Sequence, residues 1–420
     1  MKGRIQKVLL LICVIMIVGS ALHQVSSETL DSLIGEALEK NPEILAANER
    51  WQATQARVPQ VSALPNPQLM FGIRNAGFDE FTLGEDPMSM VGVTAAQMIP
   101  FPGKLSLRGK IVGVETERQK ELLNAARFGV ISSLKVAYFG LFFVHKSIEV
   151  IGKDKDILEK FAQIAEAKYA VGEGIQQDVL KAQVEVSRLI ERSTDLEQEK
   201  GRLEAEINAL LNRPPYEPLG KPDELKQSIF QKGLGELNAM ALESSPRLLA
   251  AQLAIDRNSS ALSLARREYY PDFTLKAGWF NRQDGFRDIW DFNIGVEVPL
   301  YFGRKERYGI KEAELNLNSA RQNYEATKQD VLFKVRDHYI VAQTADKLIK
   351  LYSTGIIPQA SLSLESAIAG YEVGKVDFLT LLNNLITLLN YELKYYEELV
   401  RFEKALARLE EVVGASIIEY

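Results

Sequence analysis

The chain contains two copies of one sequence pattern, and this internal duplication constrains the fold more than any other feature. ALEKNPEILAA begins at Ala37 and ALESSPRLLAA begins at Ala241, which places the copies 204 residues apart (241 − 37). Seven of these eleven positions are identical, where chance would give about one. The same shift carries Pro67 onto Pro271, and MIPFPGKLSLRGK is echoed later by EVPLYFGRKERYG. Because order and spacing are both kept, we interpret the chain as two repeats of one structural unit.

Each copy predicts an opening helix followed by two short strands. The helices are expected over 30–63 and 237–267. The strands are expected over about 67–76 and 89–99, then about 272–280 and 289–299. Apolar and polar residues alternate clearly in DFTLKAGWF and IWDFNIGVEVP, and a period of two is typical of strands. Pieces of about ten residues fit strands that cross a bilayer at a tilt, although a soluble hairpin would alternate in the same way.

Each copy then predicts a very long helix that turns and returns. The long helices are expected over 103–170 and 303–370, the second with a kink near Gly355 and Pro358. About 67 helical residues at 1.5 Å each would form a rod of roughly 100 Å. The return helices, 175–211 and 376–412, carry an apolar coiled-coil seam. Its members are Val179, Ala182, Val186, Leu189, Leu196, Leu203, Ile207 and Leu210, then Phe378, Leu382, Leu385, Leu389, Tyr396 and Leu399.

The phrase Tyr-x-Val-Gly ends both long helices, in KYAVGEG and in GYEVGKV. Its glycines, Gly172 and Gly374, allow the backbone angles that a turn between two helices needs. We expect each tyrosine, Tyr169 and Tyr371, to pack where the two helices meet. Between the repeats, NRPPYEPLGKPDEL is rich in prolines that stop the preceding helix. The mature chain therefore divides into a first repeat (28–211), a connector (212–236) and a second repeat (237–420).

Residues 1–27 have the features of an export signal. Lys2, Arg4 and Lys7 precede the apolar run VLLLICVIMIV, and small residues follow, so cleavage fits after Ala21 or after Ser27. Removing these three cations changes the net charge from −6 to about −9 (−6 − 3), which argues against a nucleic-acid partner.

The single cysteine, Cys13, lies inside the apolar core of the signal. We therefore expect neither a disulfide nor a lipid anchor in the mature protein. No later run reaches about twenty apolar residues, so no transmembrane helix is expected and any membrane part must be built from strands.

No arrangement of residues indicates catalysis. Only His145 and His338 remain after the signal, and no metal-protease, phosphate-loop or Cys/His motif is present. We expect no enzyme activity, no cofactor and no metal site.

Four strands cannot close a barrel with a lumen, and an open sheet edge cannot lie in lipid, because unpaired backbone groups cost several kcal/mol each. If the strands are in a membrane, several chains must share the wall.

The doubled plan, together with YAVGEGIQQDVLKAQ, YEVGKVDFLTLLNNL, IPFPGK and VPLYFGRK, resembles the outer-membrane efflux proteins, the TolC-like outer-membrane factors. The resemblance implies a mainly α-helical homotrimer that combines a periplasmic α-helical barrel with a twelve-stranded β-barrel in outer-membrane lipid. Such a trimer is the passive exit duct of a tripartite system, served by an inner-membrane pump and a periplasmic adaptor.

The resemblance also implies roles for residues at the hairpin tips. The tips would dock the adaptor through Tyr169, Val171, Gly172, Tyr371, Val373 and Gly374. Asp178 matches a position that often narrows the pore, although its counterpart in the second copy is the uncharged Thr380.

The motifs PFPGK and LYFGRK are similar to the heavy-metal branch of the family, which exports cobalt, zinc, cadmium, copper or silver ions. A multidrug or type I protein-secretion duct stays open as an alternative. Two alternatives from other functional classes also stay open: a periplasmic adaptor and a structural coiled-coil protein.

Overall fold

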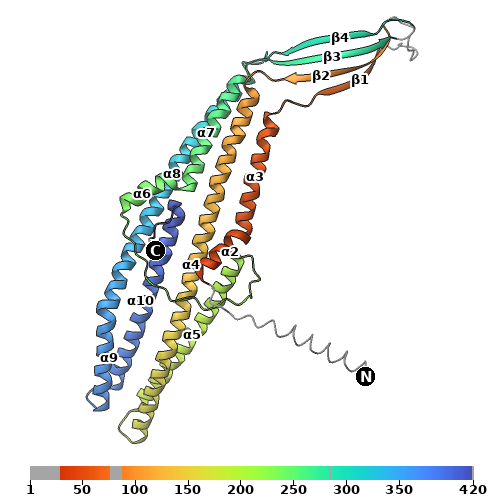
Figure 1. Cartoon of the computed structure of the whole chain (residues 1–420). Helices are drawn as coiled ribbons and strands as arrows, with labels where there is room; N and C mark the ends of the chain where they lie inside the picture. Colours follow the sequence, from red (N-terminus) through yellow and green to blue (C-terminus); the bar gives the residue numbers. More distant parts are fainter. Residues whose placement is uncertain (1–28, 76–87, 283–284, 419–420) are drawn as a thin grey trace, which may run out of the picture.

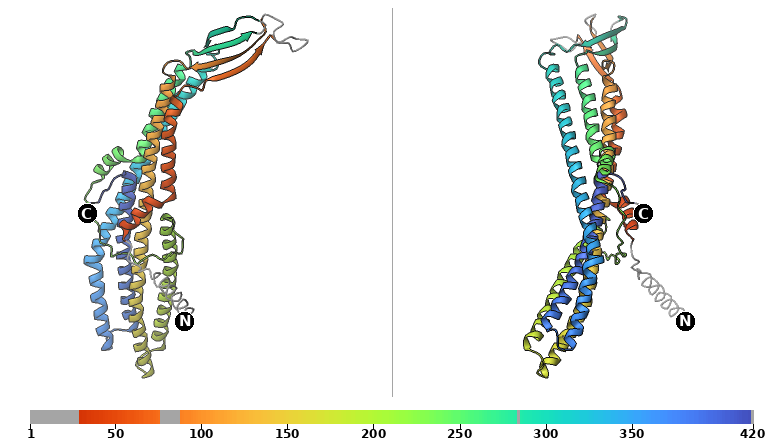
Figure 2. Two further views of the ribbon diagram at one scale, coloured as in Figure 1. Left: turned by 45° about the vertical axis from the view of Figure 1, so that its right-hand side comes forward. Right: turned by 90° about the vertical axis from the view of Figure 1, so that its left-hand side faces the viewer.

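The computed structural model describes residues 29–75, 88–282 and 285–418, so the expected export signal lies outside the described residues. The protein is a long, bent rod (Figures 1 and 2). A sheet stands at one end, two helical hairpin tips lie at the other, and the short helices gather around the middle.

The sheet has four antiparallel strands in the order β1-β2-β3-β4. The strands are β1 (Gln68–Arg74), β2 (Met90–Ile99), β3 (Asp272–Arg282) and β4 (Ile289–Glu297). Each copy contributes one neighbouring pair, and the pairing of β2 with β3 joins the copies. The four expected strands are confirmed, and β1 and β4 are the two edges.

The opening helix of each copy is not continuous, contrary to expectation. The first copy has α2 (Leu30–Lys40) and α3 (Pro42–Ser62), and the second has α6 (Leu234–Ser244) and α7 (Pro246–Arg267). The breaks fall inside the repeated phrase itself, because proline lacks the N–H that an unbroken helix needs but suits the first helical position. In the first copy, the Asn41 side chain also accepts hydrogen bonds from two backbone N–H groups of α3.

The long helices form two antiparallel hairpins. The first consists of α4 (Lys104–Ala170) and α5 (Gln176–Leu210). The second begins with α8 (Glu306–Leu351), passes through the π-helical turn η2 (Tyr352–Ile356) into α9 (Ile357–Glu372), and returns as α10 (Phe378–Val413). The interruption coincides with the expected kink, since η2 contains Gly355 and Pro358 is the second residue of α9.

Within the ranges that the structure describes, one helix, α4, has an 18-residue window apolar enough to cross a membrane, with a mean hydropathy of 1.5. Within this single chain, 61% of that window is buried. Core packing therefore explains its composition.

The predicted seam is confirmed as the packing face of the return helices. Ala182, Leu203 and Ile207 on α5, and Leu382 and Leu385 on α10, are at most 4% exposed. One large cluster fills the middle of the rod, around α4, α8 and α10. A second cluster lies toward the tips, where all four hairpin helices contribute. The two hairpins thus pack against each other as well as internally.

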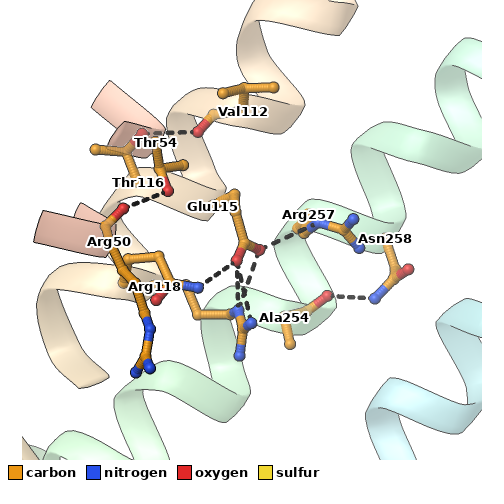
Figure 3. A network of polar contacts seen from close by, with 10 residues as sticks. Arg50, Thr54, Val112, Glu115, Thr116, Arg118, Ala254, Arg257 and Asn258 are labelled. Carbon is orange, nitrogen blue, oxygen red and sulfur yellow. Dashed lines mark hydrogen bonds and ion pairs between the residues drawn. The ribbon is translucent and has the colours of Figure 1, made fainter. Parts of the chain in front are cut away.

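Polar contacts also tie the copies together partway along the rod. Glu115 of α4 accepts hydrogen bonds from Arg118 at 3.1 Å and Gln119 at 2.8 Å, and it pairs with Arg257 of α7 at 3.2 Å (Figure 3). Burial raises the pKa of Glu115, but these donors outweigh it and leave the pKa below its usual value. The charged carboxylate therefore helps to hold α4 against α7.

A buried lysine connects the sheet to the helices. Lys104, the first residue of α4, is 2% exposed, and its ammonium group lies 3.0 Å from Glu268 and 2.9 Å from Asp272. It also donates a hydrogen bond to the Tyr270 carbonyl at 3.0 Å. Gly103 precedes it with φ +92°, a left-handed angle that favours glycine. The motif PFPGK is therefore a structural joint, called here the first joint (100–104 with 267–272).

Candidate functional site

The sheet has two chemically different faces. Directly opposed residues point to the same face, so the register sorts the side chains into rows. Two rows of the apolar face are Leu69–Ala95–Ala277–Phe292 and Phe71–Val93–Trp279–Trp290. Two rows of the other face are Gln68–Ala96–Lys276–Asn293 and Met70–Thr94–Gly278–Asp291, and the next row of that face, Gly72–Gly92–Phe280–Ile289, ends the polar pattern with the buried Phe280.

The apolar face lies open in the single chain. Phe71 is 81% exposed, Phe292 is 74% exposed and Ile294 is 75% exposed. An apolar face of this size needs an apolar surrounding, and the small and polar residues opposite suit water. With ten residues in β2 and eleven in β3, the central strands reach across a bilayer.

The two hairpin tips, at 168–175 and 370–377, have the same backbone. Gly172 has φ +79° and Gly374 has φ +69°, the left-handed angle that turns a helix end back. Glu173 N–H donates to the Lys168 carbonyl at 2.9 Å, and the equivalent Lys375 N–H donates to the Gly370 carbonyl at 2.8 Å. The repeated phrase therefore encodes a repeated turn, whose glycines lie 202 residues apart (374 − 172).

The ends of the tips are apolar and exposed. Val171 is 71% exposed, Val373 is 66% exposed and Ile175 is 58% exposed. A β-carbon added at Gly172 or Gly374 would meet no atom within 4 Å. The glycines therefore leave the end surface bare, and both valines are exposed among the described residues.

The two tyrosines of the phrase are not equivalent. Tyr371 packs edge-on against Phe378 at a centroid distance of 5.8 Å, as expected. The Lys168 ammonium lies 4.0 Å from the Tyr371 ring centroid and donates to the Tyr371 carbonyl at 3.2 Å. Tyr169, in contrast, is 47% exposed and is not part of the apolar cluster near the tips, so the expected packing is wrong for this residue.

Asp178 lies near a second carboxylate that the sequence analysis missed. Burial, and then the charge of Asp377, raise the pKa of Asp178. Asp377 caps α10 by accepting a 2.6 Å hydrogen bond from the Thr380 N–H, and this bond lowers its pKa. An aspartate directly before the apolar run FLTLL is a helix-start signal that could have identified it. Asp178 and Asp377 thus lie at the starts of the two return helices, α5 and α10, at positions that the repeat does not match.

The family model for the outer membrane efflux protein matches residues 33–213 and 237–415, which covers both copies. The chain belongs to this family. It is an outer-membrane channel of efflux systems with a periplasmic extension, and the family consists of channels rather than enzymes. The open apolar face therefore faces lipid, and the helical hairpins extend into the periplasm.

Individual relatives cover nearly the whole efflux channel. The cobalt-zinc-cadmium resistance protein CzcC of Cupriavidus metallidurans is 24% identical over 402 residues, covering 92% of this chain and 90% of the relative. The outer membrane protein TolC of Vibrio cholerae is 25% identical over 377 residues, covering 85% of this chain and 84% of the relative.

Solved structures share the fold. The structure of CusC has a TM-score of 0.80 at 16% identity and covers 94% of this chain and 96% of its own. That of VceC from Vibrio cholerae has a TM-score of 0.78 at 19% identity, with 92% and 96% covered. The channel assignment replaces the alternatives of a periplasmic adaptor and a structural coiled-coil protein.

Proposed function

We propose that three copies of this efflux channel assemble into one duct. The observation that carries the proposal is the open sheet, whose edges β1 and β4 would leave unpaired backbone groups in lipid. Pairing β4 of one copy with β1 of the next satisfies both edges, and three copies supply twelve strands. The polar rows then line the lumen, and the apolar rows contact lipid.

The second element of the proposal is that the hairpin tips dock a periplasmic adaptor, which connects the duct to an inner-membrane pump. Exposed Val171 and Val373 provide the apolar contact, and the bare glycines Gly172 and Gly374 let a partner approach the backbone. Tyr371 supports the turn from within, whereas Tyr169 is available for contact.

The third element is a carboxylate constriction beside the tips. Asp178 and Asp377 interact within one chain, so three copies bring six like charges together. Such a ring attracts cations. Because its pKa is raised, Asp178 is protonated before Asp377 as the pH falls.

Single-channel measurements test this constriction. Asp178→Asn is expected to reduce the preference for potassium over chloride severalfold, measured as the reversal potential across a salt gradient in planar bilayers. As the pH falls, the wild-type preference for potassium should begin to decline at a pH above the usual aspartate pKa, because the pKa of Asp178 is raised. The Asp178→Asn variant should not show this early decline. Asp195→Asn, an exposed aspartate further along α5, is the matched control. An unchanged reversal potential in Asp178→Asn would show that Asp178 is not part of the pore constriction.

For the cargo, we propose heavy-metal cations. The supporting observation is the likeness to CzcC over nine-tenths of both chains. Among the described residues, no group of three or more His, Cys, Asp or Glu could hold a metal ion. A passive duct needs no such site, because the pump selects the ion and supplies the energy.

Co-purification identifies the partners directly. An affinity-tagged copy of the full chain, isolated from the native membrane, is expected to bring an adaptor and a metal-type pump that mass spectrometry identifies. Loss of the chain should make cells sensitive to cobalt, zinc or cadmium. A drug-type pump or a protein-secretion pump in the complex would contradict the cargo and leave the duct intact.

A further inference from the structure

The sheet is joined to the long helices at two places, and the basic residues are buried at one and exposed at the other. At the first joint, Lys104 is buried between Glu268 and Asp272. The second joint (298–308) lies between β4 and α8, and aligning Gly103–Lys104 with Gly303–Arg304 places Arg304 where the first joint has Lys104. There, Arg304, Lys305 and Arg307 are all exposed. The Lys305 side chain is 81% exposed, and its ammonium group lies 3.9 Å from the Glu306 carboxylate.

Large apolar side chains surround these three cations. Leu300 and Tyr301 are each 75% exposed, Tyr308 is 66% exposed and Phe302 is 58% exposed. Val298 and Leu300 follow directly after β4 and are 55% and 75% exposed. The second joint therefore adjoins the end of the strand whose apolar row contacts lipid.

The backbone of the second joint is ordered. Arg304 and Lys305 N–H groups both donate to the Tyr301 carbonyl at 2.8 Å, and Arg307 N–H donates to the Phe302 carbonyl at 3.0 Å. The Tyr269 hydroxyl also donates to the Phe302 carbonyl at 3.4 Å. These bonds hold the aromatic and basic side chains together on one short turn.

The repeat indicates what a neighbouring copy could bring to this surface. In the proposed trimer, the start of β1 of the next copy takes the place that the start of β3 has at the first joint. The positions equivalent to Glu268 and Asp272 are then Leu64 (268 − 204) and Gln68 (272 − 204). Neither carries a carboxylate, so the cations of the second joint do not gain the partners that Lys104 has.

We propose that the second joint binds the phosphate headgroups of anionic phospholipids in the periplasmic leaflet of the outer membrane. The inference rests on the proposed trimer for the neighbouring residues. Exposed aromatic residues beside arginine and lysine suit the boundary between hydrocarbon and headgroups. Basic residues near an anionic membrane surface are attracted to its headgroups. The apolar side chains enter the acyl boundary, and the three cations meet the phosphates.

Native mass spectrometry of the detergent-solubilised protein tests the proposal, because it reports oligomer mass and bound lipid together. The probes are phosphatidylglycerol and phosphatidylcholine of equal chain length. Wild-type protein is expected to retain phosphatidylglycerol preferentially. In the variant Arg304→Gln/Lys305→Gln/Arg307→Gln, the ratio of retained phosphatidylglycerol to phosphatidylcholine should fall at least about tenfold. The matched control, Arg321→Gln/Arg336→Gln/Lys347→Gln, removes three exposed cations from α8 and should bind like wild type.

Three results would overturn the proposal: equal retention of both lipids, an unchanged preference in the triple variant, or full displacement by inorganic phosphate at the lipid's own concentration. The last would indicate an ion site only. A failure of the trimer appears separately, as a monomer mass, and leaves the lipid comparison measurable for each chain.

Discussion

Export is expected to be lost, with the trimer intact, when leucine replaces both tip glycines, Gly172 and Gly374. A side chain at either position meets no neighbouring atom, so it projects from the end surface where the adaptor docks. Each tenfold loss of adaptor affinity corresponds to about 1.4 kcal/mol. A clash repeated at the six tips of a trimer is expected to cost more binding free energy than this. The measurement is metal or drug resistance of a deletion strain that carries the variant, with trimer mass determined in parallel.

Asparagine at the same two positions separates docking from turn formation. Leucine strains a backbone with φ of +79° or +69° by about 1–2 kcal/mol, whereas asparagine tolerates the left-handed region. If docking needs a bare backbone, the asparagine variant also loses export. If the glycines only shape the turn, the asparagine variant keeps both the turn and export. The pair Gly152→Leu/Gly201→Leu is the control, because both glycines are helical, exposed and without neighbours near an added β-carbon. Normal export with leucine at both tips would refute the docking assignment.

Lys104→Met is expected to lower the free energy of unfolding by about 3 kcal/mol. Removing one partner of a buried ion pair typically costs about 3–5 kcal/mol, because the other charge stays buried and unpaired. We place the effect at the lower end, since the Glu268 side chain is 40% exposed while that of Asp272 is 15% exposed. Denaturant titration of the refolded protein in detergent measures the change.

A compensating variant tests the cause of this loss. Adding Glu268→Gln and Asp272→Asn to Lys104→Met removes the unpaired charges and should recover most of the stability. Asparagine at 272 can still accept the 2.7 Å hydrogen bond that the Phe101 N–H donates. Lys110→Met, an exposed lysine on the same helix, should change stability by less than about 0.5 kcal/mol. If the triple variant is no more stable than Lys104→Met, the ion pair is not the reason for the burial of Lys104.

Much of the candidate site could be predicted because its signals are local. The phrase Tyr-x-Val-Gly places a glycine where a helix must turn, and both glycines have the positive φ that this role requires. The alternation in the strands identified the lipid-facing rows, since a period of two puts one set of side chains on one face. The breaks at Pro42 and Pro246 are equally local, since a proline inside a helical pattern is a stop signal, and they make the expected continuous opening helices wrong.

The amino-acid sequence by itself determined the duplication, the helices and strands, the two turns and the apolar seams, because each depends on residues close together in the chain. Only the tertiary structure decided which side chains meet. Lys104 and Glu268 are 164 residues apart (268 − 104), and Asp178 and Asp377 are 199 apart (377 − 178). Tyr169 and Tyr371 occupy the same place in the repeat, yet only Tyr371 packs against its return helix. Periodicity states which face of an element is apolar, but charge pairing depends on distances that arise only when the two copies pack together.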